Sequence, residues 1–375
     1  MAERRRETIT TRRRVLPLCL RPWTTFEIDD GAGRQGLVRP CCWAAVDVGD
    51  LNTQRPRDIW NGPGYVEFRR RMLAGDIQDV CPDHCPFVTP SARDRGGYRD
   101  MHVLTYLRRL VRRPRANSWL NLAEIAGGAT RLRSMPVDIK LTPTLACNQR
   151  CVMCFQDHNP RAVLSEQALE DVLALLPGAQ LLRLQGGELL AAAEGLTFLE
   201  RLAGLRRRPP ISLVTNGTFP AERAWSLLAG LKLDWVVVSV DAANPETYEL
   251  IHRSRAWHDV VANARRLRDL AQVHRLGRFR VLLNFTLMTL NWREAPSFVR
   301  LAASLGLDVS FNPLIHPEEL AVLGRPNAPE GLGTALDEAL GLAEQARLWN
   351  AQVTLRGLID MTRGAAFEGT SSRCE

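Results

Sequence analysis

Six short apolar runs alternate with amphipathic stretches between residues 134 and 315, and this alternation constrains the fold more than any other feature. The runs lie at residues 137–141, 181–185, 211–215, 235–240, 280–287 and 308–314, and helical patterns such as 165–176 separate them. Strands that alternate with helices predict a parallel sheet with right-handed crossovers. We therefore expect an α/β fold in which an open, partial (β/α)6 barrel carries its chemistry at the carboxyl ends of the strands.

The first 92 residues differ from the barrel region. They are rich in Gly, Pro and Cys and show one clear helical run, at residues 64–74. A segment of this kind has little core of its own, so we expect a bound metal to hold it together. The expected organisation is a small cysteine-rich domain at 1–92, a basic helical linker at 93–133 with a helix at 101–112, the partial barrel at 134–320, and a last helix at 330–349 with a tail within 321–375.

The chain carries 49 basic and 41 acidic residues, a formal net charge of +8. All of the basic residues except Lys140 and Lys232 are arginine, a bias typical of a GC-rich genome. No aromatic-interleaved basic stripe accompanies the charge, so we do not expect nucleic acid as a partner. A positive surface can instead attract an acidic protein.

No apolar run approaches the roughly 18 residues that a membrane-spanning helix needs, and no apolar stretch follows the N-terminal arginines as it would in a signal peptide. We therefore expect a cytoplasmic location and no membrane partner. In that reducing compartment the nine cysteines are expected to stay free of disulfides. Closely spaced cysteines then indicate metal or cluster ligands.

Three cysteines, Cys147, Cys151 and Cys154, follow the first expected barrel strand in a CxxxCxxC pattern. Three thiolates on one loop can hold three irons of a cubane cluster and leave the fourth iron without a protein ligand. The alternative is a structural zinc site. Such a site takes four ligands, and His158 is the nearby candidate for the fourth.

This loop resembles that of the radical S-adenosylmethionine (SAM) superfamily, and the resemblance continues along the TIM-like barrel. Residues at the ends of later strands match the motifs that bind SAM in that family, although Met153 stands where an aromatic residue is usual and Leu189 where a proline often follows the GGE turn. The resemblance implies a SAM-binding 4Fe-4S cluster on the three cysteines. The SAM-binding residues that it implies are Met153, Gln185, Gly186, Gly187, Glu188, Asn216, Ser239, Asp241 and Asn284.

The N-terminal cysteines carry a second resemblance, to the SPASM/twitch iron-sulfur extension. Cys19, Cys41, Cys81 and Cys85 supply four thiolates, which is a full set for an auxiliary 4Fe-4S cluster. Cys42 can exchange with Cys41 in this role. A zinc knuckle is the alternative for the four cysteines, and the extension precedes the barrel here, whereas it usually follows it.

Polar residues alternate along the expected strands and predict a polar substrate cavity. Side chains two apart share a face of a strand, which places Lys140 and Arg183 on the same face as polar residues at the strand ends. Two cations in the cavity would suit a carboxylate, a phosphate or a hydroxyl-rich ligand. Asp157 and His158, just after the cysteine loop, are the candidate catalytic residues for proton transfer.

The family resemblance implies an enzyme that cleaves SAM reductively to a 5′-deoxyadenosyl radical, which abstracts a hydrogen atom from the substrate. A flavodoxin or ferredoxin-type reductant would supply the electrons, and the auxiliary cluster would relay them. We expect a polar small molecule, saccharide-like or a secondary metabolite, as the substrate. Two alternatives remain: a maturase of a ribosomally made peptide, and a non-catalytic iron-sulfur electron carrier or scaffold, which would not need Gly186, Gly187 and Glu188.

Overall fold

The computed structural model describes residues 17, 19–29, 35–44, 46–77, 79–81, 85, 97–156, 164–219, 222–323 and 328–362. One nine-stranded sheet runs through them in the order β3-β2-β1-β4-β5-β6-β7-β8-β9. The strands β4 to β9 are all parallel to their neighbours. Their bounds are Asp138–Leu141, Leu181–Leu184, Ile211–Thr215, Leu233–Ser239, Arg280–Leu287 and Asp308–Pro313.

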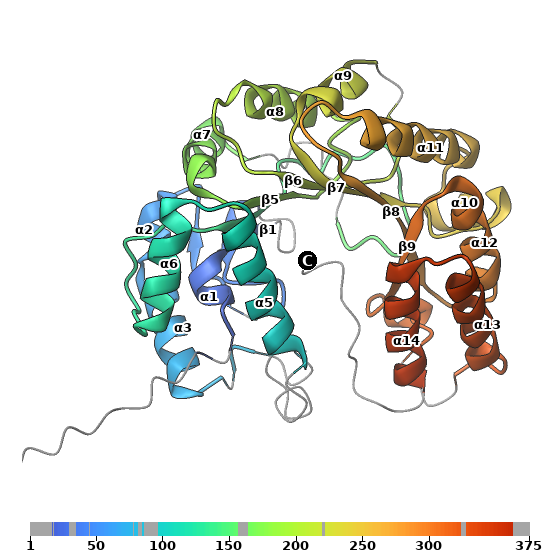
Figure 1. Cartoon of the computed structure of the whole chain (residues 1–375), viewed down its shortest axis with the longest axis horizontal. Coiled ribbons are helices and arrows are strands. Elements are labelled where there is room, and N and C mark those ends of the chain that lie inside the picture. Colours follow the sequence, from blue (N-terminus) through green and yellow to red (C-terminus); the bar gives the residue numbers. More distant parts are fainter. Residues whose placement is uncertain are drawn as a thin grey trace, which may run out of the picture.

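These six strands confirm the expected α/β partial barrel, since β3 and β9 end the sheet without pairing to each other. Each strand coincides with one of the six apolar runs to within about two residues. The helices between them arch over the sheet in Figure 1. They are α7 (Glu166–Leu175), α8 (Ala193–Gly204), α9 (Glu222–Gly230), α10 (Pro245–His252), α11 (Trp257–Val273) and α12 (Ala295–Leu305).

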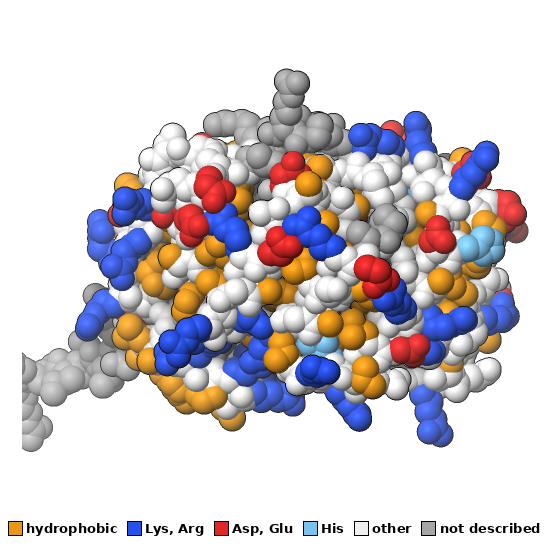
Figure 2. Space-filling model, turned by 90° about the horizontal axis from the view of Figure 1, so that it is seen from above, with side chains coloured by type: hydrophobic (Ala, Val, Ile, Leu, Met, Phe, Trp, Pro, Cys, Tyr) orange, Lys and Arg blue, Asp and Glu red, His pale blue; other side chains and the backbone are white. Residues whose placement is uncertain are grey.

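Local sequence fixes where two of these helices begin. Ser165 caps α7 by accepting a hydrogen bond from the Ala168 amide, and Asn244 caps α10 in the same way from Thr247. Ion pairs link the outer helices, as between Arg266 of α11 and Glu222 of α9. On the face drawn in Figure 2, Lys and Arg side chains are accordingly interspersed with Asp and Glu rather than gathered into one patch.

The N-terminal segment extends the same sheet. It supplies β1 (Thr25–Asp29), β2 (Leu37–Arg39) and β3 (Gly49–Asp50), and β1 lies parallel to β4. The helices of this part are α1 (Arg21–Thr24), α2 (Pro56–Trp60), α3 (Pro63–Ala74), α5 (Gly97–Arg112) and α6 (Ala116–Ala126). The expected helix at 64–74 is confirmed, and the one at 101–112 begins four residues earlier.

Our expectation that this segment has little core is wrong. Trp23, Trp60 and Tyr65 are completely buried. The buried Arg69 guanidinium lies 4.4 Å from the centre of the Trp60 ring, and it donates to the carbonyls of Pro22, Trp60 and Thr130. Aromatic side chains bury large apolar areas. Their packing therefore stabilises the segment in addition to any bound iron-sulfur cluster.

The C-terminal part holds two helices where we expected one at 330–349. They are α13 (Leu332–Gln345) and α14 (Trp349–Thr362). Arg347 has a φ of +56°, a left-handed conformation that a helix does not continue through, and the chain turns back there. Thr354 of α14 accepts a hydrogen bond from the Phe311 amide, so α14 covers part of the exposed edge of β9. No described helix is long and apolar enough to cross a membrane.

Candidate functional site

The loop after β4 brings the three candidate ligands Cys147, Cys151 and Cys154 together. Each thiol is half-buried. Burial raises the pKa of Cys147 and of Cys151, and the nearby charge of Cys154 raises both further. Thiols this close can ligate one shared cluster, because cluster binding removes their protons and neutralises their mutual repulsion.

Two hydrogen bonds to residues of α10 hold the cysteine loop in place. The Val152 amide donates to the Ile251 carbonyl at 2.9 Å. Gln149, which is buried, donates from Nε2 to the Tyr248 hydroxyl at 2.7 Å. Met153 is partly buried in a small apolar cluster with Ile251, Met288 and Leu314, so its side chain borders the site but is already packed by protein.

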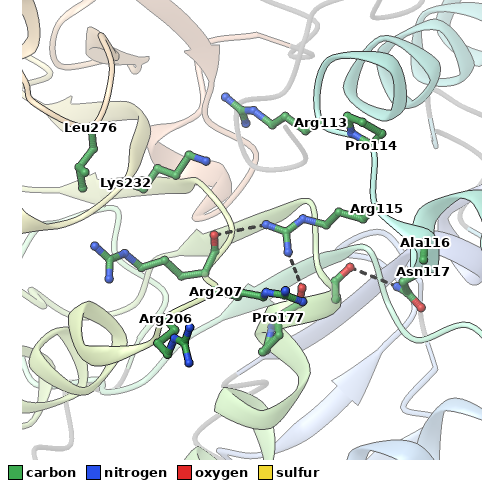
Figure 3. A pocket seen from close by; sticks show the side chains of 12 residues that line it. Arg113, Pro114, Arg115, Ala116, Asn117, Pro177, Arg206, Arg207, Lys232 and Leu276 are labelled. Carbon is green, nitrogen blue, oxygen red and sulfur yellow. Dashed lines mark hydrogen bonds between the residues drawn. The ribbon is translucent and has the colours of Figure 1, made fainter.

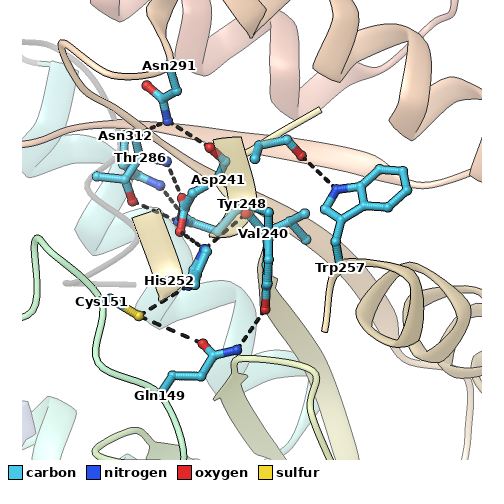
Figure 4. Close-up of polar contacts among 12 residues, drawn as sticks. Gln149, Cys151, Val240, Asp241, Tyr248, His252, Trp257, Thr286, Asn291 and Asn312 are labelled. Atoms are coloured by element: carbon cyan, nitrogen blue, oxygen red, sulfur yellow. Dashed lines mark hydrogen bonds and ion pairs between the residues drawn. The ribbon is translucent and has the colours of Figure 1, made fainter. Parts of the chain in front are cut away.

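His252 connects this loop to the end of β7 (Figure 4). Its Nδ1 lies 3.1 Å from the Cys151 Sγ. Its Nε2 lies 3.0 Å from the Val240 carbonyl and 3.4 Å from Asp241 Oδ2. Two acceptors face Nε2, so that nitrogen carries a hydrogen. Nδ1 is then the acceptor for the Cys151 thiol.

Asp241 lies at the centre of a buried polar network at the ends of β7 and β8. Its backbone is left-handed, with φ +57°, and its side chain is 1% exposed. Oδ1 accepts from Asn284 Nδ2 at 3.1 Å and from the Thr286 amide at 2.5 Å. The Asn291 side chain donates to the Asp241 carbonyl at 2.8 Å. Oδ2 has no hydrogen bond among the residues described, although it lies 3.4 Å from His252 Nε2.

The GGE turn after β5 packs directly on the backbone of the cysteine loop. The Gly187 amide donates to the Thr144 carbonyl at 2.9 Å, and the Glu188 amide donates to the Ala146 carbonyl at 2.8 Å. A Cβ on Gly187 would lie 2.0 Å from the Ala146 carbonyl oxygen. Gly186 has a φ of +138°, which favours glycine. The two glycines are therefore required by the protein's own packing, independently of any ligand.

Glu188 contacts the next strand through both of its carboxylate oxygens. Thr215 donates to both at 2.9 Å, the Asn216 amide donates to Oε2 at 2.5 Å, and the Leu190 amide donates to Oε1 at 3.0 Å. Burial raises its pKa to about 7, although these hydrogen bonds lower it. Glu188 thus fixes the position of the Thr215-Asn216 turn against the GGE turn.

Asn216 lies beside the cysteine loop. Its Nδ2 is 3.8 Å from the Cys147 Sγ and donates to Asn148 Oδ1 at 2.9 Å. Ser239 is half-buried at the end of β7 and pairs in register with Asn284, and Gln185 is half-buried at the end of β5. The candidate SAM-binding residues therefore gather at the carboxyl edge of the sheet, next to the three cysteines.

The candidate ligands of the auxiliary cluster also come together. Burial raises the pKa of Cys19, and it raises the pKa of Cys81 to about 12. The charges of the neighbouring Cys41 and Cys85 contribute to both increases. Cys41 and Cys85 are buried. Cys42, in contrast, is disulfide-bonded, so our expectation that all nine cysteines stay free of disulfides is wrong, and Cys42 does not exchange with Cys41 as a ligand. Four thiols in one another's electrostatic range match the ligand set of a [4Fe-4S] cluster.

No group of three or more His, Cys, Asp or Glu side chains in the described ranges is arranged for a single metal ion. A [4Fe-4S] cluster takes each thiolate on a different iron, so its ligands lie farther apart than those of one ion. The three cysteines of the barrel loop, with the orphaned Oδ2 of Asp241 near them, fit such a cluster and a polar ligand beside it.

The cavity cations are not free for a substrate, contrary to our expectation. Lys140 forms a buried ion pair with Glu27 on β1. Arg183 pairs with Asp138 at 3.0 Å. The expected polar side chains are present on the later strands, but they are uncharged amides and hydroxyls. Asn312 donates to Asn284 Oδ1 at 2.7 Å and to Ser310 Oγ at 3.2 Å.

Sequence reasoning missed several residues of the site. His252, Tyr248 and Gln149 contact the loop from α10 or within it, and no motif distinguishes them. Asn244, which caps α10, is the one signal that a helix begins just after the Asp241 strand end. The candidate catalytic residues Asp157 and His158, and Cys374 in the tail, lie outside the described residues.

A parallel partial barrel with a three-cysteine loop at its carboxyl edge defines the class of protein. The family model for the radical SAM superfamily matches residues 141–319, and the model for SPASM, an iron-sulfur cluster-binding domain, matches residues 19–86. The chain thus contains a radical SAM domain and carries a SPASM domain ahead of it. These two domains imply 4Fe-4S clusters and SAM as cofactors.

Curated relatives match about half of this chain. GTP 3′,8-cyclase of Streptomyces coelicolor is 30% identical over 183 residues, 46% of this chain and 52% of that protein. GTP 3′,8-cyclase of Desulforamulus reducens is 28% identical over 58% of this chain and 66% of that protein. The chain thus spans about half the length of the first of these relatives. A solved structure of Streptococcus suis SuiB covers 70% of this chain and 61% of its own, at 13% identity and a TM-score of 0.44.

Proposed function

We propose that this protein is a radical SAM enzyme that cleaves SAM reductively and removes a hydrogen atom from a polar small molecule. The observation that carries the proposal is the contact between the cysteine loop and the GGE turn. The Gly187 and Glu188 amides hydrogen-bond to the backbone of Thr144 and Ala146, immediately before Cys147. These contacts hold the GGE turn, which the family resemblance assigns to SAM binding, directly beside the three candidate cluster ligands.

In this proposal Cys147, Cys151 and Cys154 hold the cluster. When bound, the reduced cluster and SAM supply a one-electron cleavage that yields a hydrogen-abstracting radical. The SAM site is surrounded by the GGE turn, Asn216, Ser239, Asn284 and Met153, and Gln185 lies at its edge. Asp241 faces the SAM site with a carboxylate whose Oδ1 accepts from Asn284 and the Thr286 amide. His252 positions Cys151 through the contact of its Nδ1 with the thiol.

The four N-terminal cysteines hold the auxiliary cluster in this proposal. Cys41 rather than Cys42 completes the set, because the charge of Cys41 acts on both Cys19 and Cys81. A flavodoxin or ferredoxin-type protein supplies electrons from outside. Asp157 and His158 remain the candidates for proton transfer to the product, on sequence grounds alone.

The cavity favours a neutral, hydrogen-bonding substrate, because Lys140 and Arg183 are already paired. Asn284, Thr286, Ser310 and Asn312 present amides and hydroxyls on neighbouring strands. Such groups recognise hydroxyl-rich molecules with well-defined geometry. We therefore propose a saccharide-like or similar polar metabolite as the substrate.

A purine nucleotide is the second candidate substrate, since the curated relatives are named GTP 3′,8-cyclases. The match covers 46% of this chain and 52% of the Streptomyces coelicolor protein. The paired state of Lys140 and Arg183 weighs against a triphosphate in this cavity.

The test uses the full chain with both clusters reconstituted anaerobically. Dithionite, SAM and either GTP or a panel of nucleotide sugars and free sugars are added, and 5′-deoxyadenosine and substrate loss are quantified by mass spectrometry. We expect 5′-deoxyadenosine above background with a sugar-type compound, and none from the Cys147→Ala variant. Stimulation by GTP alone would replace the saccharide proposal. Clusters without any SAM cleavage would favour an electron carrier.

A further inference from the structure

A strongly basic pocket lies at the end of the barrel opposite to the cysteine loop. It has a volume of about 810 Å³, within the range of small-molecule sites. Its lining comes from the loops before β5, β6, β7 and β8 and from the link between α5 and α6 (Figure 3). The cationic side chains in the lining are Arg113, Arg115, Arg206, Arg207, Arg208 and Lys232.

Two of these cations are held rigidly by backbone carbonyls. Arg115 donates to the carbonyls of Pro177 and Arg208. Arg208 donates to the carbonyls of Leu205 and Gly230, at 3.1 and 2.8 Å. Both guanidinium groups are thus fixed by neutral acceptors, which orient them without neutralising their charge. Arg113 alone forms a salt bridge, to Asp234 at 3.0 Å.

The other three cationic side chains of the pocket have no hydrogen-bond or ion-pair partner among the described residues. Arg206 and Arg207 are exposed and Lys232 is half-buried. Desolvation and then the charges of Arg113, Arg115 and Arg208 lower the pKa of Lys232, against a smaller opposite effect of Asp234. Desolvation and the charges of Arg113 and Arg207 likewise lower the pKa of Arg115.

We propose that this pocket binds the di- or triphosphate group of a small molecule. A ligand with several negative charges matches the excess of cations, whereas a single carboxylate would leave most of them unneutralised. Guanidinium forks also match phosphate oxygens in bidentate geometry. Leu276, which is 45% exposed, and Pro114 in the same lining offer an apolar surface for the rest of the molecule.

The position of the pocket distinguishes this site from the one proposed for catalysis. All four barrel loops that line it precede their strands, while the GGE turn, Asn216 and Asp241 follow theirs. The strand β7 between the two ends has seven residues, a length of about 23 Å at ~3.3 Å per residue. The pocket is concave and has the volume of a small-molecule site, which favours a small polyanion over an electron-transfer protein.

Titration calorimetry with sodium tripolyphosphate tests the proposal on the reconstituted full chain. The variant Arg206→Gln/Arg207→Gln/Lys232→Met removes the three unpaired cations. The matched control, Arg55→Gln/Arg57→Gln/Arg133→Gln, removes three exposed positive charges elsewhere. We expect the pocket variant to weaken binding by at least about tenfold, equivalent to ~1.4 kcal/mol, and the control by less than about twofold, with SAM cleavage unchanged in both.

Equal weakening in both variants would show diffuse attraction to a basic protein and would overturn the proposal. So would the absence of tripolyphosphate binding to the unaltered chain at millimolar concentration. If an acidic flavodoxin, and not tripolyphosphate, loses affinity for the pocket variant, the surface is a protein-docking site and the proposal is wrong. Because the readout is binding, none of these outcomes depends on which substrate the catalytic site accepts.

Discussion

Substitution of Gly187 by alanine should destroy the cluster site of the barrel before it affects SAM directly. The added Cβ would lie 2.0 Å from the Ala146 carbonyl oxygen and 2.7 Å from the Leu145 carbonyl carbon. Since real Cβ contacts essentially never fall below 3.0 Å, backbone next to Cys147 must move by about 1 Å or more. Overpacking costs about 1–3 kcal/mol, and displacement of backbone places Gly187→Ala at the upper end.

The assay is the iron content of the anaerobically reconstituted variant, together with its urea unfolding curve. We expect Gly187→Ala to lose the cluster of the barrel loop and to keep the auxiliary one, so iron per chain falls to about half, and the free energy of unfolding falls by about 3 kcal/mol. Gly204→Ala is the matched control, because a Cβ there meets nothing within 4 Å. Full iron loading and unchanged stability in Gly187→Ala would refute the packing argument.

Three further predictions follow from the same geometry. Replacing Cys147, Cys151 and Cys154 together by alanine should halve the iron of the reconstituted protein, measured by colorimetric iron assay, and loss of all iron would contradict two independent sites. Lys140→Met should lower the free energy of unfolding, measured by urea titration, by about 3–5 kcal/mol, because it leaves Glu27 buried without its partner. The double variant Lys140→Met/Glu27→Gln should regain part of this loss. In the metal-free chain, burial raises the pKa of Glu188 to about 7, against 4.5 in the unfolded chain. The folded state therefore holds an extra proton between these two pH values, so the contribution of Glu188 to the free energy of unfolding should be complete below pH 4.5 and fall by at most about 3 kcal/mol as the pH rises through 7. Glu188→Gln should abolish this pH dependence in urea titrations.

The barrel strands could be predicted because their apolar runs are short, regularly spaced and separated by helical patterns. Strand β6 coincides with its run at both ends, and β4 begins one residue late. The N-terminal segment could not be predicted in this way. Its strands are two to five residues long, and its core is built from single aromatic residues such as Trp23 and Tyr65, which lack a repeating pattern.

The motifs of the site were readable because each follows a strand, and parallel strands bring their carboxyl ends to one edge. The roles of individual side chains were not. Gly187 is required against Ala146, and Glu188 is occupied by Thr215 and Asn216. His252 reaches Cys151 across 101 residues of sequence. Contacts of this kind depend on the relative placement of distant segments, which periodicity does not encode.

The ion pairs of the cavity depend on how β1 joins the barrel, and the same junction relates the two cysteine sets. Glu27 on β1 stands in register with Lys140 on β4. Cys19 precedes β1, whereas Cys147 follows β4. Because β1 and β4 are parallel, the two candidate cluster sites lie toward opposite ends of these strands, with the Glu27–Lys140 pair between them. An electron that passes between the sites must therefore travel along the strands, past a buried and neutralised ion pair. Pairing Lys140 with Glu27 keeps an uncompensated charge out of that interior.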